Sequence, residues 1–184
     1  MLNRDYEGQN CSIARALEVV GERWTLLIIR DVLLGLHRFD EFQESLGIAR
    51  NVLTDRLNRL VDEGVLERVL YSERPERYEY QLTKKGLDLN IALTALRQWG
   101  DRWRAPDGPP LQLLHRECGH ITELVPVCAH CHAPVGPTDV SAIAAPGYLP
   151  TISTVNSGDD MPKSSRSKRS GASAKQRPRP GTSR

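Results

Sequence analysis

Two short amphipathic segments that follow one another almost without a gap constrain the fold of this chain more than any other feature. The first extends from Phe39 to Gly47, and the second begins near Arg50 and reaches Gly64. In both, apolar residues recur every three or four positions, as in a helix that buries one face, and a glycine ends the pattern. These apolar positions are Phe39, Phe42, Leu46, Leu53, Leu57 and Leu60. Two helices joined by so short a turn predict a helix-turn-helix.

The second helix carries a polar face opposite its leucines. In a helical projection, that face holds Asn51, Thr54, Asp55, Asn58 and Asp62, with Arg50, Arg56 and Arg59 at its start and flanks. Asparagine can pair with adenine and arginine with guanine in the major groove, whereas threonine suits a phosphate or a thymine methyl group. The predicted DNA contacts on this helix are therefore Arg50, Asn51, Thr54, Asp55, Asn58 and Arg59.

A structural alternative exists for the three arginines. They can simply solvate a surface helix and pair with Asp62 or Glu63, which is common on isolated amphipathic helices. Arg56 lies nearer the packing side, and we expect it to be mostly structural. Asp55 is unfavourable near phosphate unless it pairs with Arg56 or Arg59, or accepts a hydrogen bond from a cytosine amine.

After Gly64 the pattern changes from helix to strand. Two segments have the apolar patterns of strands, one at residues 65–71 and one at residues 78–82. The charged segment 72–77 between them predicts a hairpin tip. Arg74 and Arg77 at this tip are expected to enter the minor groove or hold its phosphates. Arg38, at the start of the first helix of the pair, is a candidate contact to the DNA backbone.

Further helices are predicted on both sides of this unit. The segment before Gly21 spaces its apolar residues as a buried stripe, and the segment from Trp24 to Leu34 is apolar on nearly every side, as in a core helix. Thr83 should cap a long last helix whose apolar surface exceeds what a small domain covers, so part of it is assigned to a dimer contact. The residues of the two stripes are Ile13, Ala16, Leu17 and Val20 in the first helix, and Leu87, Leu89, Ile91, Ala92, Ala95, Leu96, Trp99 and Trp103 in the last.

The predicted fold class is mainly α with a small β-wing, which is an α+β winged helix-turn-helix. With 184 residues, of which 39% are hydrophobic and 26% charged, the chain can form one core and a small appendage. The predicted division is a DNA-binding and dimerisation domain at 1–104, a linker at 105–111, a Cys/His-rich module at 112–144 and a disordered basic tail at 145–184. No apolar run is long enough to span a bilayer and no segment resembles a signal peptide, so we expect a soluble, cytoplasmic protein.

The charge of the chain is unevenly distributed. Eight of the 25 basic residues and no acidic residue lie from Met161 onward, so residues 1–160 carry 17 basic against 23 acidic residues. A tail of this kind usually only solvates the chain, but it can also add nonspecific attraction to phosphate. Since the body is mildly acidic, its positive charge must be concentrated locally if it binds DNA.

The stretch from Cys11 to Trp103 closely resembles the HxlR family of bacterial winged helix-turn-helix regulators. The residues that carry the resemblance are Cys11, Gly21, Trp24 to Ile28, Arg38, Phe39, Phe42, Val52 to Thr54, Arg56, Leu57, Gly64, Arg74, Pro75, Tyr78 to Tyr80, Leu82, Thr83, Gly86 and Trp99. The resemblance implies a homodimer joined through its first and last helices, which binds an inverted repeat in double-stranded DNA and represses or activates neighbouring genes. Many members have serine at Ala49 and lysine near Asn51. These differences remove a helix cap and a phosphate-binding cation, which Arg50 could replace, and they leave the operator sequence open.

The module predicted after residue 111 contains two pairs of metal-ligand residues. His115 and Cys118 are separated by two residues, as are Cys128 and Cys131, and nine residues lie between the pairs. This spacing is typical of a zinc ribbon, with Gly119 suited to a tight turn and residues 121–127 to a hairpin. Four such ligands leave no open coordination position, so the zinc would be structural, and no catalytic residue is predicted. Other candidates for the nitrogen ligand are His120, His130 and His132.

Three other interpretations of these cysteines stay open. They can be free thiols in a loose extension, or Cys128 and Cys131 can serve a thiol or redox enzyme, although the sequence lacks the βαβ context of such chemistry. The ribbon can also recruit a protein partner while the winged domain acts only as a scaffold.

Cys11 stands apart from the module, directly before a helix. The helix dipole can favour its thiolate, as an oxidant-sensing cysteine requires, and the resemblance adds that some relatives sense oxidants through a cysteine at this place. The structural alternative is a small hydrophobe at the dimer interface, and among its neighbours in sequence only Arg15 is basic. The signal that controls the protein, whether oxidant, small ligand or zinc, stays open.

Overall fold

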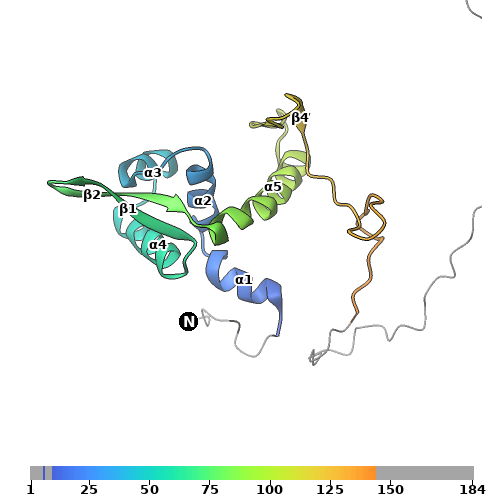
Figure 1. Ribbon diagram of the computed structural model, residues 1–184, viewed down its shortest axis with the longest axis horizontal. Coiled ribbons are helices and arrows are strands. Elements are labelled where there is room, and N and C mark those ends of the chain that lie inside the picture. The colour runs from blue at the N-terminus through green and yellow to red at the C-terminus, as the bar shows by residue number, and fades with distance from the viewer. Residues whose placement is uncertain (1–5, 7–9, 144–184) are drawn as a thin grey trace, which may run out of the picture.

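The structure, a computed structural model, describes Tyr6 and residues 10–143 (Figure 1). The predicted basic tail lies outside the described residues. Five helices and a two-stranded hairpin form the winged domain in the described part, and a second, shorter hairpin follows. The elements in chain order are α1 (Ser12–Val20), α2 (Thr25–Leu33), α3 (Phe39–Leu46), α4 (Arg50–Asp62), β1 (Leu66–Glu73), β2 (Glu76–Leu82), α5 (Lys84–Arg104), β3 (Leu113–Leu114) and β4 (Ile121–Thr122).

The hydrophobic core lies between α2, α3, α4 and the start of β1. Phe42 of α3 is completely buried, as are Ile28 and Ile29 of α2, which confirms the prediction that residues 24–34 contain the core helix. The three leucines of α4, Leu53, Leu57 and Leu60, are buried in the same cluster. Because these leucines share one side of the helix, the residues on the opposite side face outward; these are Asn51, Thr54, Asp55 and Asn58.

The turn between α3 and α4 is as short as the sequence predicts. Gly47 adopts a left-handed conformation, with φ of 59°, and its N–H donates to the Gln43 carbonyl to end α3. Ile48 is then buried against the core before α4 begins. Ala49 is the N-cap of α4 and makes no side-chain cap hydrogen bond, so the loss of a cap predicted at this position is confirmed.

The wing is the antiparallel hairpin of β1 and β2, which pair from Leu66 with Leu82 to Glu73 with Glu76. The predicted tip of six residues is wrong, because cross-strand pairing continues until only Arg74 and Pro75 remain between the strands. Backbone hydrogen bonding, which polar side chains do not prevent, extends the ladder into this charged segment. The wing is consequently a long ribbon that projects well beyond the helices (Figure 1).

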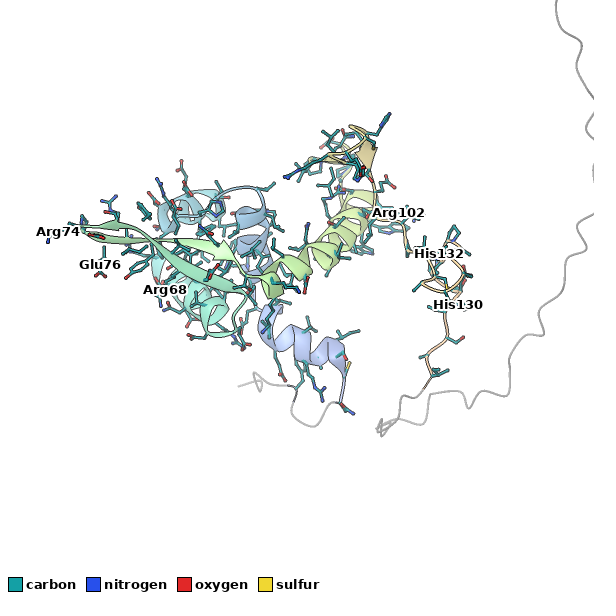
Figure 2. All side chains as sticks on the ribbon, viewed as in Figure 1. Arg68, Arg74, Glu76, Arg102, His130 and His132 are labelled. Carbon is teal, nitrogen blue, oxygen red and sulfur yellow. The ribbon has the colours of Figure 1, made fainter. Side chains whose placement is uncertain are left out.

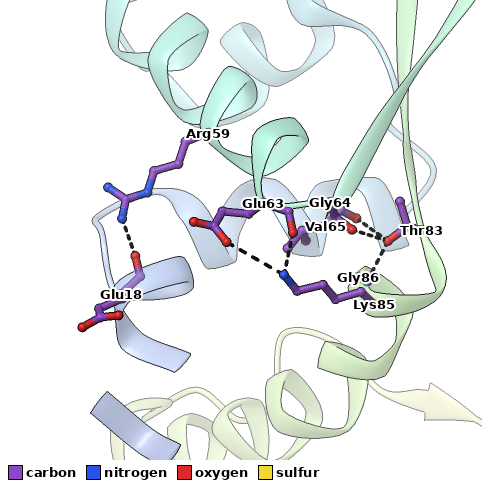
Figure 3. A network of polar contacts seen from close by, with 8 residues as sticks. All are labelled: Glu18, Arg59, Glu63, Gly64, Val65, Thr83, Lys85 and Gly86. Atoms are coloured by element: carbon purple, nitrogen blue, oxygen red, sulfur yellow. Dashed lines mark hydrogen bonds and ion pairs between the residues drawn. The ribbon is translucent and has the colours of Figure 1, made fainter. Parts of the chain in front are cut away.

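The base of the wing is fixed to α4 and α5 by a small polar network (Figure 3). The Thr83 hydroxyl lies 2.6 Å from the Gly64 carbonyl oxygen and accepts a hydrogen bond from the Gly86 N–H at 3.2 Å, which confirms Thr83 as the cap of α5. Gly86 packs so closely against the Val65 carbonyl that an added Cβ would clash with it. The Lys85 ammonium donates to the Glu63 carbonyl at the end of α4. These contacts fix the direction in which the wing leaves the domain.

The apolar faces of α1 and α5 point largely away from the core. In α1, Ile13 is 70% exposed and Leu17 is 40% exposed, whereas Ala14 and Val20 are buried, so the prediction of a stripe buried within the domain is wrong for Ile13 and Leu17. Ala16 is exposed as well. The periodicity of an apolar stripe is the same whether it faces the core of its own chain or another surface.

Helix α5 divides its apolar residues between two surfaces. Leu89 and Leu93 pack against the core cluster. The exposed residues, with at least half of each side chain accessible, are Leu87, Ile91, Leu96, Trp99 and Trp103. This unburied surface agrees with the expectation that α5 carries more apolar area than one domain covers.

The segment after α5 folds back onto the end of that helix. The Gln98 side chain pairs with both backbone groups of Leu124, at 2.9 and 3.2 Å, and Arg97 donates to the Leu111 carbonyl at 3.0 Å. Strands β3 and β4 enclose the turn at residues 115–120, so the predicted hairpin at 121–127 is wrong, and that segment instead connects two turns. Among the described helices, none combines the length and the apolar character needed to cross a membrane.

Candidate nucleic-acid interface

The outward face of α4 presents two amide side chains. Asn51 and Asn58 are both exposed, on the side of the helix opposite the buried leucines. Within the described residues, neither amide has a side-chain hydrogen-bond partner. They are seven residues apart, which is about 10 Å along a helix at 1.5 Å per residue. Two free amides at this separation suit recognition of bases about three steps apart in a major groove.

Thr54 and Asp55 lie between these amides and are also exposed. The Thr54 hydroxyl donates to the Arg50 carbonyl at 2.9 Å, which leaves its methyl group and one oxygen lone pair available. Asp55 lies 3.2 Å from the Arg56 guanidinium, which is one of the two pairings considered from the sequence. That neighbouring cation partly offsets the negative charge on the outer face.

Arg50 is positioned at the start of α4 by an aromatic ring. Its guanidinium lies 4.8 Å from the centroid of the Phe39 ring, at the first residue of α3. The first turn of α4 contains no acidic residue. Positive charge from Arg50 and from the helix N-terminus is therefore concentrated at one end of the outer face.

Arg56 and Arg59 face the body of the domain rather than the outside. Arg56 forms an ion pair with Glu22 at 3.0 Å and is largely buried, so the prediction that it is mostly structural is confirmed. Arg59 was predicted to contact DNA, but its guanidinium donates to the Glu18 carbonyl and so joins α4 to α1 (Figure 3). The helical projection places Arg59 on a flank of α4. The hydrogen bond to the Glu18 carbonyl of α1 directs its side chain inward.

Arg38 connects the start of α3 to the wing. Its guanidinium lies 3.0 Å from the Glu79 carboxylate of β2, and its charge lies 4.6 Å from the centroid of the Tyr71 ring of β1. The hydrogen bond that the Arg38 guanidinium donates to the Glu79 carboxylate raises the pKa of Arg38. Glu41 accepts hydrogen bonds from the backbone N–H groups of His37 and Arg38, which lower its pKa and fix the first turn of α3. Arg38 thus holds the wing against the helix pair.

The wing ends in exposed arginines. Arg74 lies at the tip of the wing (Figure 2). Arg77 lies beside it on β2, and both arginines are exposed. The tip also carries Glu73 and Glu76, and Glu76 accepts a hydrogen bond from Tyr78 at 3.1 Å. Cations at the end of a long ribbon can reach phosphates that α4 cannot reach.

Arg68 is an exposed cation that the sequence reasoning did not select. It lies on β1, opposite Tyr80 of β2, and its guanidinium is 5.9 Å from the centroid of the Tyr78 ring. Because β1 packs beside α4, Arg68 lies on the ribbon between the wing tip and α4 (Figure 2). The sequence does hold a signal for Arg68. Side chains alternate along a strand, so Arg68 lies on the same face as Leu66 but farther from the core, where a cation is exposed.

The comparisons with known proteins agree with this geometry. The profile of the HxlR-like helix-turn-helix family matches residues 19–107. Over 148 residues the chain is 44% identical to an uncharacterized HTH-type transcriptional regulator of Mycobacterium tuberculosis, a match that covers 80% of this chain and 92% of the relative. The chain belongs to the HxlR family.

Two solved structures extend the similarity of this HxlR protein. PA1607, provisionally assigned as a transcription factor, is 40% identical with a TM-score of 0.67, covering 75% of this chain and 97% of its own. PA1374 of Pseudomonas aeruginosa, with the same provisional assignment, is 46% identical with a TM-score of 0.54, covering 76% and 95%. The resemblance inferred from the sequence is confirmed, and the protein is a member of a family of DNA-binding transcriptional regulators. The match to the Mycobacterium tuberculosis relative covers 148 residues, which is more than the winged domain contains. The similarity therefore continues beyond that domain.

Cys11 occupies the N-cap position of α1 and is exposed. The nearby Arg15 guanidinium donates to the Asn10 side chain at 2.8 Å. The redox role of Cys11 stays a prediction.

The four predicted metal ligands fall into two separate turns. His115 Nδ1 lies 3.1 Å from Cys118 Sγ in the first turn, and Cys128 and Cys131 share the second. Within the described residues, no group of three or more potential ligands comes together. The N–H groups of Cys131 and His130 donate to the Cys128 sulfur and lower the pKa of its thiol. The structure therefore forms both predicted pairs but keeps them apart.

Proposed function

We propose that this HxlR protein is a sequence-specific transcriptional regulator that binds an inverted repeat in double-stranded DNA as a homodimer. The observation that carries the proposal is the outer face of α4, where Asn51 and Asn58 are exposed and have no side-chain partner among the described residues. Arg50 borders this face at one end, and the wing arginines extend beyond it.

The division of work between these residues follows from their surroundings. Asn51 and Asn58 supply directional donors and acceptors that can distinguish adenine, each with a discrimination of about 1–3 kcal/mol. Thr54 offers a methyl group to thymine. Arg50, Arg74 and Arg77 supply phosphate attraction, which fixes the register on the duplex without selecting sequence. Arg59 and Arg56 contribute by holding α4 in place.

The exposed apolar residues of α1 and α5 support the homodimer. Ile13 is 70% exposed, Ile91 62% and Trp103 64%, which is unfavourable for a chain that stays monomeric in water. A twofold dimer presents two copies of α4 in opposite directions. It therefore reads two half-sites in inverted orientation, with centres about one turn of DNA, 34–36 Å, or a multiple of it apart.

The test begins with selection of binding sites from a pool of random duplexes by the full chain. We expect an enriched inverted repeat, which then serves as the probe in fluorescence-anisotropy titrations. Asn58→Ala and Asn51→Ala should each reduce the preference for the selected site over a variant site by about 5- to 150-fold. They should change nonspecific binding little.

Gln112→Ala is the matched control, since it removes an exposed amide from the segment after α5. Its affinity for the selected site should equal that of the unmodified protein. Recovery of no enriched sequence, or an unchanged preference in both asparagine variants, would show that α4 does not read bases.

A further inference from the structure

The structure builds the same turn twice in the Cys/His module (residues 112–144). In the turn at 115–120, the N–H of His115 donates to the His120 carbonyl at 2.9 Å, and the N–H of Gly119 donates to the His115 carbonyl at 2.8 Å. In the turn at 128–133, the corresponding bonds are also 2.9 and 2.8 Å. The residue after the second ligand has positive φ in both, 71° at Gly119 and 58° at His132.

Each turn places its two candidate ligands on the same side of a tight loop. In the first, the 3.1 Å between His115 Nδ1 and Cys118 Sγ is close to the spacing of about 3.5 Å between nitrogen and sulfur ligands on a tetrahedral zinc. In the second, Cys128 Sγ accepts backbone hydrogen bonds from His130 and Cys131. Such bonds orient a sulfur atom for a metal.

The structure also favours His115 over its competitor in the first turn. His120 Nδ1 lies 2.8 Å from the Cys118 carbonyl oxygen, so that ring is held by the backbone. His130 and His132 belong to the second turn, which already supplies two sulfur atoms (Figure 2). His115 occupies the first position of the first turn, and Cys128 occupies the equivalent position of the second turn. No other histidine among the described residues lies at such a position.

The module lacks a hydrophobic core to hold these turns. No residue from 105 to 143 is buried. Three apolar side chains between the two turns are exposed, with Ile121 at 56%, Val125 at 62% and Val127 at 54%, and Leu124 is half-buried. A segment of about 40 residues rarely stays ordered without a disulfide, a metal or a partner. The three cysteines of the module are free thiols, so no disulfide takes this role.

We propose that His115, Cys118, Cys128 and Cys131 together bind one structural zinc ion, and that binding draws the two turns together within one chain. The nine residues between Cys118 and Cys128 are long enough to fold back and bring the sulfur atoms within about 4 Å, since an extended chain spans about 3.3 Å per residue. Closure would cover the exposed apolar residues between the turns. With three thiolates and one imidazole, the tetrahedron is complete and offers no position to a substrate.

A site within one chain is favoured because the first turn is already fixed to its own helix. Gln98 and Arg97 of α5 hold the segments on both sides of that turn through Leu124 and Leu111. The second turn is joined to this anchor by the short segment 125–127. A zinc ion shared between two chains would instead require the turns of both copies to meet across the dimer.

The experiment measures zinc in the full-length protein after purification and dialysis. We expect one zinc ion per chain, and replacement by Co²⁺ should give the intense visible absorption of a tetrahedral thiolate site. Cys118→Ser, Cys131→Ser and His115→Ala should each lower the bound zinc from one per chain towards none. Cys11→Ser and His120→Ala are matched controls and should retain it.

Two further measurements keep the proposal falsifiable. Circular dichroism should show unchanged helix content in the ligand variants, because the winged domain has its own core. A mixture of His115→Ala/Cys118→Ser with Cys128→Ser/Cys131→Ser should bind no zinc. Recovered binding in the mixture would place the site between chains, and retention of zinc by Cys118→Ser would confine it to the second turn. Either result overturns the proposal, as does reversible oxidation of Cys128 and Cys131 in a zinc-free protein.

Discussion

The wing arginines offer the most quantitative test of how this HxlR protein holds DNA. Arg74 and Arg77 are exposed at the end of the ribbon. The proposed homodimer would carry two such wings and would bring four of these cations to the duplex. Each phosphate neutralised adds about 0.9 to the slope of log affinity against log salt. If each arginine holds one phosphate, Arg74→Gln/Arg77→Gln should reduce that slope by about 3.6. From 50 to 200 mM salt, the unmodified protein should then lose about 150-fold more affinity than the variant.

The assay is fluorescence anisotropy with the selected duplex at several salt concentrations. Arg104→Gln/Arg116→Gln removes the same charge at the opposite end of the molecule from the wing, and should leave the slope unchanged (Figure 1). A slope that falls equally in both double variants would indicate a general effect of net charge. A slope that stays constant in the wing variant would refute the assignment of Arg74 and Arg77 to phosphate.

Three other predictions follow from the packing and from Cys11. Gly86→Ala should destabilise the domain by about 1–3 kcal/mol in thermal or urea unfolding, because the added Cβ meets the Val65 carbonyl, whereas Gly100→Ala, with open space around it, should not destabilise it. Ile91→Asp should convert the proposed dimer to monomer in analytical ultracentrifugation, and a dimer that persists would exclude this face of α5 from the interface. Cys11→Ser should retain DNA affinity after oxidant treatment that weakens the unmodified protein, and equal weakening of both would mean that Cys11 is not the sensor.

The helix pair could be predicted from the sequence because its signal is local. Leu53, Leu57 and Leu60 recur at the helical period, and the structure buries all three, so the polar face of α4 followed directly. The face of α1 could not be predicted in the same way. Ile13 has the spacing of a buried residue, but its surroundings depend on whether α1 packs against its own domain or against another copy.

The direction of single arginines was beyond the reach of sequence patterns. Arg59 occupies a flank of α4 that is close both to the outer face and to α1, and the Glu18 carbonyl, 41 residues away in the chain, decides its direction. The wing tip was misjudged for a related reason. Charged residues such as Glu73 and Glu76 suggested a loop, although strand pairing needs only their backbone groups.

Five arginines of the winged domain divide into two groups with complementary roles. Arg38 joins the start of α3 to both strands of the wing. Arg59 joins α4 to Glu18 of α1, and Arg56 joins α4 to Glu22, which follows α1. These contacts fix the recognition face and the wing relative to one another before DNA arrives, so less conformational entropy is lost on binding. Arg74 and Arg77 remain exposed at the tip to meet phosphate. Because residues 1–160 carry more acidic than basic charge, affinity depends on how precisely these few cations are placed. Arg38→Ala should accordingly weaken DNA binding even though its side chain is already paired, through a wing that no longer holds its position.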